Sequence, residues 1–188
     1  RIADSLTQRG PDGLRIWEGG PLSLVHSHFW TTPEEVGEEQ PITRGPLTLA
    51  ADARIDNRGE LIPLLIEYLS KEVPSDAEII LAAYQKWKED APRHLIGDFA
   101  FAIWDDEEER LFCARDPVGV RLFQYAQIGT SFVFGSSVGA VIAALEVIPE
   151  INIPFIADLL ANRWERWVHE TGYQEIFRLP PAYSLTVS

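Results

Sequence analysis

The clearest pattern in the chain is a short stretch in which large and small apolar side chains alternate. In a strand, Phe99, Phe101 and Ile103 would share one face. The opposite face would hold Ala100, Ala102 and Trp104. Neither face is polar, so we expect this strand to be covered on both sides. A strand covered on both sides requires a layered fold.

Further apolar runs and capping signals predict the remaining elements. Strands are expected over residues 14–18, 22–30, 47–55, 111–115, 122–126 and 132–134. Helices are expected over residues 1–6, from about 60 to 70, from 75 to about 89, from 136 or 137 to about 145, and from about 154 to 164. Ser75 and Glu78 form a capping box. Pro63 would damage a helix interior, so its helix is expected to begin near Glu60.

Loops and turns separate these elements. Residues 9–13 and the acidic run 105–110 are expected to be turns, and residues 31–45 a loop. Arg115 and Asp116 are expected to form an internal ion pair that fixes a turn. Residues 177–182 resemble a linker leading to a further domain. The order strands, helices, strands, helices predicts an α+β fold with mostly antiparallel sheets packed face to face and helices outside.

Length and composition limit the possible functions. The 188 residues fit one domain with a short extension, and the missing start residue suggests a piece of a longer protein. A net charge of −13 disfavours nucleic-acid binding. A single cysteine excludes an intrachain disulfide and fits a reducing, cytoplasmic location. No stretch is typical of a membrane span or a signal peptide.

Few residues suggest chemistry by themselves. Cys113 lies between apolar neighbours and is expected to be buried and structural. His26 and His28 share one face of a strand; a metal would need two more ligands, one of them conceivably Asp52, and ordinary hydrogen-bonded histidines are the alternative. Asp76 in a first helical turn complements the helix dipole or holds a ligand ammonium group. No phosphate-binding loop is present, so no ATP site is expected in this piece. No metal and no other cofactor is expected in it either.

Seven segments, in order, resemble one protein family. They are RGPDG (9–13), QP (40–41), DNRGEL (56–61), SDAE (75–78), GDFAFAIWD (97–105), ARDPVGV (114–120) and FRLPPA (177–182). Over nearly its whole length the chain resembles the N-terminal glutaminase domain of glutamine-dependent asparagine synthetases. The spacing of GDFAFAIWD and ARDPVGV is the most specific part of this resemblance.

The resemblance implies a class II glutamine amidotransferase fold of the N-terminal-nucleophile hydrolase type, a four-layer α-β-β-α sandwich whose first strand is missing from this chain. In active members an N-terminal cysteine attacks the glutamine amide, with its own α-amino group as base. Ammonia then passes to a synthetase domain that uses ATP and magnesium. On this basis residues 1–150 would form the glutaminase-like domain, and residues 151–188 a helix and linker leading to an absent C-terminal synthetase domain, the expected partner.

The resemblance also places site residues, and most of them depart from the family. The arginine that binds the glutamine carboxylate falls on His28. The Asn-Gly pair at the oxyanion falls on Asp52 and Ala53, and only the ammonium-binding aspartate has a match, Asp76. Exchanging arginine for histidine weakens carboxylate capture, and a carboxylate at the oxyanion opposes the charge that develops there. We therefore expect no catalytic residue in this chain and a degenerate glutamine pocket.

Several functions remain open at this stage. The chain could be a scaffold domain in an asparagine-synthetase-like ligase, including a β-lactam synthetase or a lasso-peptide cyclase. It could be a working glutaminase domain whose cysteine precedes residue 1, with glutamine as substrate. An interaction domain outside any ligase is the third possibility. Trp164 and Trp167 suggest a docking face near the linker, and a homodimer is left open.

Overall fold

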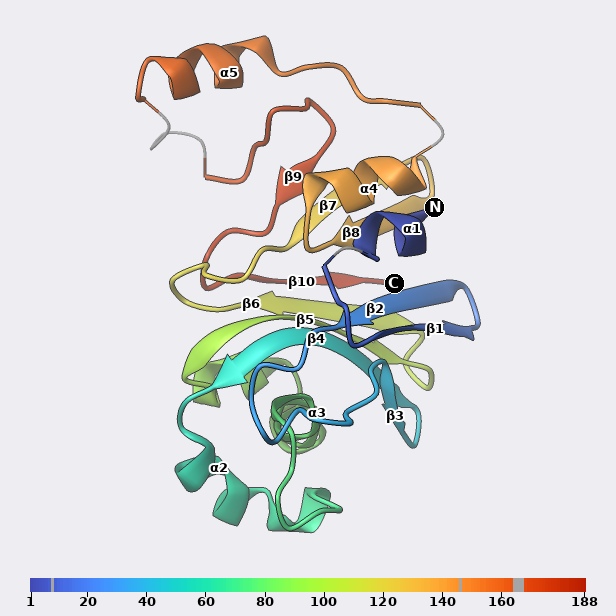
Figure 1. Ribbon diagram of the computed structural model, residues 1–188, viewed down its shortest axis with the longest axis vertical. Helices are drawn as coiled ribbons and strands as arrows, with labels where there is room; N and C mark the ends of the chain where they lie inside the picture. The colour runs from blue at the N-terminus through green and yellow to red at the C-terminus, as the bar shows by residue number, and fades with distance from the viewer. Residues whose placement is uncertain (8, 146, 164–167) are drawn as a thin grey trace.

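The computed structural model describes residues 1–7, 9–145, 147–163 and 168–188, and it is built from three antiparallel sheets (Figure 1). The largest sheet has the order β10-β6-β5-β4-β3. Its strands are β3 (Ile42–Arg44), β4 (Leu47–Ile55), β5 (Gly97–Asp105), β6 (Arg110–Arg115) and β10 (Ser184–Val187). The smaller sheets are the hairpin of β1 (Gly13–Gly19) with β2 (Leu22–His28), and β8 (Ser131–Gly135) with β7 (Gln124–Ile128) and β9 (Phe177–Arg178).

Helices cover the sheets on both sides and give four layers (Figure 1). On one side of the five-stranded sheet lie α2 (Arg58–Leu64), η1 (Ile66–Tyr68), α3 (Asp76–Trp87) and η2 (Lys88–His94). On its other side lie the two smaller sheets, and beyond them α1 (Ile2–Leu6) and α4 (Val138–Ala144). The last helix, α5 (Ile153–Leu160), lies at the edge of the molecule, farther from the large sheet than α4. Among the described residues, no helix is long and apolar enough to cross a membrane.

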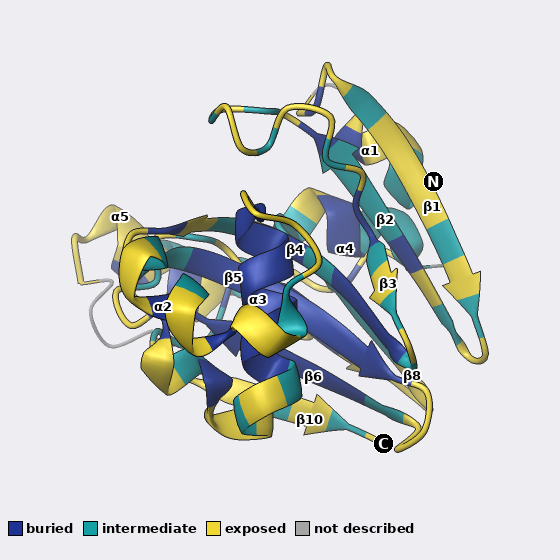
Figure 2. Ribbon diagram, turned by 90° about the horizontal axis from the view of Figure 1, so that it is seen from below, coloured by how far each residue is buried: buried dark blue, intermediate teal, exposed yellow. Residues whose placement is uncertain are grey.

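Strand β5 lies at the centre of the core, and its predicted double burial is confirmed (Figure 2). Phe99, Phe101 and Ile103 pack into a cluster with the helix α3. Ala100, Ala102 and Trp104 face a second cluster, which includes Phe134 of β8 and Phe123, the residue before β7. Cys113 is fully buried in this second cluster, as expected, and burial raises the pKa of its thiol well above the ordinary value. The alternation of large and small side chains thus builds two different interfaces from one strand.

The capping box at the start of α3 is confirmed. The Oγ of Ser75 accepts a hydrogen bond from the N–H of Glu78 (3.3 Å), and the carboxylate of Glu78 accepts one from the N–H of Ser75 (2.9 Å). Residues Asp76 to Tyr84 of this helix are all buried. A helix that is buried nearly all round belongs in the core, which fixes the position of its N-terminal residues.

Three local elements differ from the sequence prediction. Part of the expected loop 31–45 is strand β3, which pairs with the start of β4. Helix α2 begins at Arg58, earlier than predicted, so Pro63 lies inside the helix and beyond its first turn, where its missing N–H removes one helical hydrogen bond. Helix α5 ends at Leu160, before the predicted end at residue 164, which lies outside the described residues.

The segment read as a linker contributes strands to two sheets. Strand β9 pairs with β7, and β10 pairs with β6. Leu179 between them is buried in the core cluster that separates the sheets. Residues 177–187 are therefore part of the packed fold. That residues 151–188 also lead to a synthetase domain stays a prediction.

A tight turn follows β6, and the predicted ion pair within it takes another form. The carboxylate of Asp116 accepts hydrogen bonds from the backbone N–H groups of residues 118–121. The guanidinium of Arg115 donates to the carbonyls of Gly119, Arg121 (2.6 Å) and Leu179 (2.7 Å). Both side chains fix the turn, as expected, but each does so through backbone groups.

Candidate functional site

A cleft of about 360 Å³ lies where β2, β4, β5 and β8 meet the loop 29–40. All four residues that the resemblance placed in a glutamine pocket line this cleft: His28, Asp52, Ala53 and Asp76. They come from the end of β2, the middle of β4 and the first turn of α3. The four positions that the resemblance assigned to one pocket therefore lie together in the folded chain. Their roles toward a ligand stay predictions.

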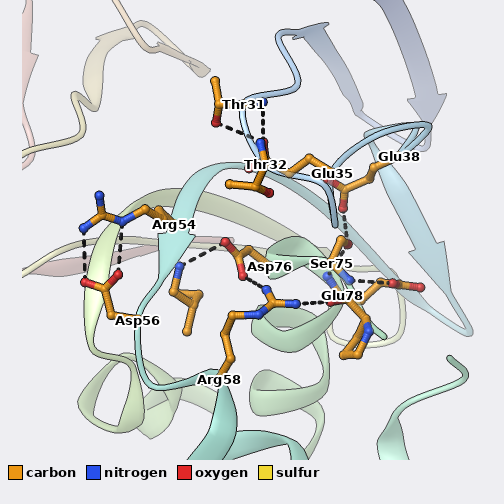
Figure 3. A network of polar contacts seen from close by, with 12 residues as sticks. Thr31, Thr32, Glu35, Glu38, Arg54, Asp56, Arg58, Ser75, Asp76 and Glu78 are labelled. Atoms are coloured by element: carbon orange, nitrogen blue, oxygen red, sulfur yellow. Dashed lines mark hydrogen bonds and ion pairs between the residues drawn. The ribbon is translucent and has the colours of Figure 1, made fainter. Parts of the chain in front are cut away.

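Asp76 is buried, and both of its carboxylate oxygens are occupied (Figure 3). One oxygen accepts a hydrogen bond from the N–H of Ile55 (3.0 Å) at the end of β4. The other forms an ion pair with the guanidinium of Arg58, at the start of α2. Burial raises the pKa of Asp76, while the Ile55 N–H and Arg58 act against that rise. A ligand ammonium group would have to share this carboxylate with Arg58.

Arg58 itself is held in place by a second bond. Its guanidinium also donates to the carbonyl of Pro74, just before α3. The arginine thus joins the first turn of α2 to the residues that open α3 (Figure 3). Arg58 was not predicted as a site residue, although it lies in the DNRGEL segment that carries part of the resemblance. Only the folded chain brings it against Asp76.

Asp52 projects from the face of β4 opposite to that of Ala53, because successive side chains in a strand alternate. Its carboxylate is half-exposed and forms an ion pair with Arg121 (Nη1 to Oδ1, 3.1 Å). Burial raises the pKa of Asp52, and the positive charges of Arg121 and Arg9 oppose the rise. Arg121 was also missed from the sequence. It directly follows the ARDPVGV segment, and Asp116 binds its backbone N–H.

The two histidines of β2 bind each other rather than a shared third group. The Nε2 of His26 lies 3.0 Å from the carbonyl of Ala51, which can only accept, so His26 Nε2 carries the proton. The two Nδ1 atoms of His26 and His28 are 3.0 Å apart. Burial, with the neighbouring His28, lowers the pKa of His26 to about 4, so this ring is neutral at pH 7 and accepts the proton of His28.

His28 is therefore a poor site for an anion. Burial also lowers its pKa below the ordinary value, and its Nδ1–H is engaged by His26. A neutral imidazole offers no positive charge to a carboxylate, and it lacks the paired donors of an arginine. In the described residues, moreover, no group of three or more His, Cys, Asp or Glu side chains is placed to hold a metal ion.

The loop 31–39 gives the rim of the cleft two further carboxylates (Figure 3). Glu35 folds the loop by accepting hydrogen bonds from the N–H groups of Thr31 (2.8 Å) and Thr32 (3.1 Å). Glu38 accepts a hydrogen bond from the Oγ of Ser75, the cap of α3. Burial raises the pKa of Glu38, against the effect of its hydrogen bonds from Ser75 and Gln40. The cleft is thus rich in carboxylates.

Comparison with known proteins agrees with this architecture. A family model described as a glutamine amidotransferase domain matches residues 1–188. The chain belongs to the glutamine amidotransferase domain family. Among curated proteins, asparagine synthetase [glutamine-hydrolyzing] 3 of Bacillus subtilis is 32% identical over 100% of the chain, which aligns with 31% of that protein. Asparagine synthetase [glutamine-hydrolyzing] 1 of Saccharomyces cerevisiae is 32% identical over 64% of the chain and 21% of its own length.

The solved structures support the fold of this glutamine amidotransferase domain. The glutamine phosphoribosylpyrophosphate amidotransferase of B. subtilis, complexed with ADP and GMP, has a TM-score of 0.51 and 23% identity. The match covers 63% of this chain and 28% of that one. At this identity the likeness shows the fold alone, and it agrees with the predicted sandwich of antiparallel sheets. The chain spans only about a third or less of the length of these relatives.

Proposed function

We propose that this glutamine amidotransferase domain is the N-terminal part of an ATP-dependent, amide-forming ligase resembling asparagine synthetase, and that its own cleft does not hydrolyse glutamine. The domain then serves as a scaffold for the synthetase portion. The observation that carries the proposal is the ion pair between Arg58 and Asp76. It neutralises, from within the chain, the one carboxylate that matches the family's ammonium-binding aspartate.

The α-carboxylate and the amide carbonyl of glutamine would also lack suitable partners in this cleft. The α-carboxylate would meet the neutral ring of His28. The carbonyl oxygen, which gains negative charge during amide attack, would lie near the carboxylate of Asp52. An oxyanion needs donors, and the loss of one donor costs roughly 100-fold or more in rate. Each of these features lowers affinity or rate, and together they favour a scaffold.

The rest of the proposed chemistry lies outside this chain. ATP and magnesium would act in the synthetase portion, which forms the activated acyl intermediate. That portion would be the partner of this domain within one polypeptide. The lengths of the curated relatives support this arrangement, because this chain aligns with only 31% of the B. subtilis synthetase.

A working glutaminase is the second candidate, and the names of the relatives favour it. Both curated synthetases described above are called glutamine-hydrolyzing. On this alternative, a cysteine before residue 1 supplies the nucleophile, and glutamine enters the cleft after Arg58 moves away from Asp76.

The deciding experiment measures glutamate release from glutamine by the full-length protein. ATP consumption supported by ammonia, with candidate acceptor acids, is the internal control for an intact synthetase portion. We expect ammonia-supported activity without glutamate release above a blank. Steady release of glutamate would overturn the scaffold proposal and establish the alternative. ATP consumption that depends on neither nitrogen donor would argue against an asparagine synthetase and for a ligase whose amine belongs to the acceptor substrate, such as a β-lactam synthetase.

A further inference from the structure

The helix α5 and the segment before it expose a group of large apolar side chains. We call this group the α5 face; its members are Val147, Ile148, Ile151, Ile153, Leu159 and Leu160. Leu160 is the most exposed of them, at 83%. Single exposed apolar residues are ordinary on protein surfaces, but here six fall within fourteen consecutive residues. Exposed apolar surface that gathers in one part of a protein is common at interaction sites.

The α5 face carries little charge, although the chain as a whole is strongly acidic. Residues 147–160 contain two ionisable side chains, Glu150 and Asp158. Asp158 is buried and forms an ion pair with Arg163 (2.8 Å), and the Glu150 carboxylate accepts a hydrogen bond from the side chain of Gln174 (3.3 Å). Asp158 is thus buried, Glu150 is the exposed carboxylate of this segment, and the other exposed side chains of residues 147–160 are mostly apolar.

Contacts on one side attach helix α5 to the rest of the domain, and its other side is exposed to solvent. Phe155 is buried and lies under the guanidinium of Arg178, 5.8 Å from the ring centroid. The N–H of Asn152 donates to the carbonyl of Gly172 (2.9 Å), and Ile151 pairs with Tyr173. These contacts fix α5 at the edge of the molecule, where Figure 1 shows it standing away from the large sheet. A helix that is apolar on its outer side as well is normally covered by another part of the protein.

We propose that the α5 face is the docking surface for the synthetase portion of the same polypeptide. This inference rests on the proposed function, which supplies that portion. The B. subtilis relative aligns with the whole of this chain using 31% of its length, so more than enough protein remains to cover the face. A tethered portion also has a high effective concentration at the surface, an advantage that a second copy of the chain lacks. Trp164 and Trp167, expected to form a docking face, lie outside the described residues.

The test uses the full-length protein with a photo-crosslinking residue, p-benzoylphenylalanine, in place of Leu160. The matched control carries it in place of Ile96, an exposed apolar residue (61%) far along the chain from α5. We expect crosslinks from position 160 to peptides beyond residue 188 of the same chain, with a yield independent of protein concentration. Crosslinks mainly to a second copy, rising with concentration, would overturn the proposal. A yield no higher than that from position 96 would also overturn it.

A charge variant makes the test quantitative. With the crosslinker at position 148, we expect L160D to reduce the yield at least about tenfold, because burying a carboxylate in place of a leucine opposes docking. I96D should leave the yield unchanged, and circular dichroism checks that both variants fold. Ammonia-supported ATP consumption separates the two hypotheses. Activity without the crosslinks overturns only the docking surface, whereas crosslinks without activity overturn only the proposed ligase.

Discussion

The Asp116 carboxylate offers the sharpest test of how the fold holds its central turn. It is fully buried and accepts hydrogen bonds from four backbone N–H groups, those of residues 118–121. The substitution Asp116→Asn keeps the shape of the side chain. It removes the negative charge and replaces Oδ2, the acceptor for the N–H of Arg121, by an amide nitrogen that can only donate.

The size of the effect follows from these contacts. Hydrogen bonds to a charged group contribute about 1.5–3 kcal/mol each and neutral ones about 0.5–1.5, so three bonds weaken. The fourth is lost and leaves a buried N–H without its acceptor, at a cost of about 1–3 kcal/mol. Since the four bonds act as one unit, we expect a total loss of ~3–5 kcal/mol in the free energy of unfolding. That is a large share of the ~5–15 kcal/mol typical of a domain.

Urea denaturation of the full-length protein, followed by tryptophan fluorescence and circular dichroism, measures this loss. The matched control is Asp90→Asn, which removes an exposed carboxylate paired with Arg93 (3.2 Å). Exposed pairs contribute little, so the control should change the free energy of unfolding by less than about 1 kcal/mol. A loss for Asp116→Asn no larger than that of the control would refute the view that this carboxylate holds the turn.

Asp116 should also make the free energy of unfolding decrease at low pH. Burial acts to raise the pKa of Asp116, but the backbone hydrogen bonds outweigh it and hold the pKa below its ordinary value. As the pH falls, the unfolded chain therefore takes up this proton before the folded one does. The stability that Asp116 contributes is complete above pH ~4 and is lost as the pH falls through the folded-state pKa. Asp116→Asn should remove this part of the acid dependence.

Three further predictions concern the cleft and its supports. His26 has a pKa of about 4 in the folded state, against an ordinary value of 6.5, so the unfolded chain binds this proton first as the pH falls. The free energy of unfolding should therefore fall by up to ~3 kcal/mol between pH ~6.5 and ~4. Urea denaturation at a series of pH values measures this fall, and His26→Gln should remove most of it. Arg58→Ala leaves the buried Asp76 carboxylate without its ion-pair partner, so we expect the free energy of unfolding to fall by ~2–3 kcal/mol. The pKa of Asp76 should rise further, and NMR titration of the carboxyl groups measures that rise. An unchanged titration of Asp76 would contradict the pairing. Ser75→Ala removes the cap of α3 and the donor to Glu38, and thermal unfolding should show a loss of ~1–2 kcal/mol, whereas Ser5→Ala on the exposed helix α1 should change stability by less than about 0.5 kcal/mol.

The parts of the fold that were predictable are those set by local signals. The capping box fixed the start of α3, and the apolar run 47–55 gave β4 with the bounds that the structure has. The alternation over 99–104 led to the layered sandwich, because burial on both faces follows directly from the side chains. These signals reside in neighbouring residues, where periodicity and capping chemistry act.

The parts that were missed depend on distant pairing. Strands β3 and β10 have three and four residues, too few to show a period, and each forms only because a long partner strand offers an edge. The prolines after Leu179 favoured a linker over strands. The cleft shows the same division. Asp76 was singled out by its place in a capped helix, but Arg58 reaches it only because α2 folds beside the start of α3.

The two short strands β9 and β10 bear on how this domain folds during synthesis. Strand β10 pairs with β6, some seventy residues earlier, and β9 pairs with β7. During synthesis on the ribosome, the backbone N–H and C=O groups on one edge of β6 and of β7 therefore stay unpaired until residues 177–187 have emerged. Neither sheet layer can close before then, because long-range strand pairing comes late. The nascent chain is thus most exposed to strand-to-strand aggregation just before residues 177–187 appear, and a variant that lacks them would keep both edges open.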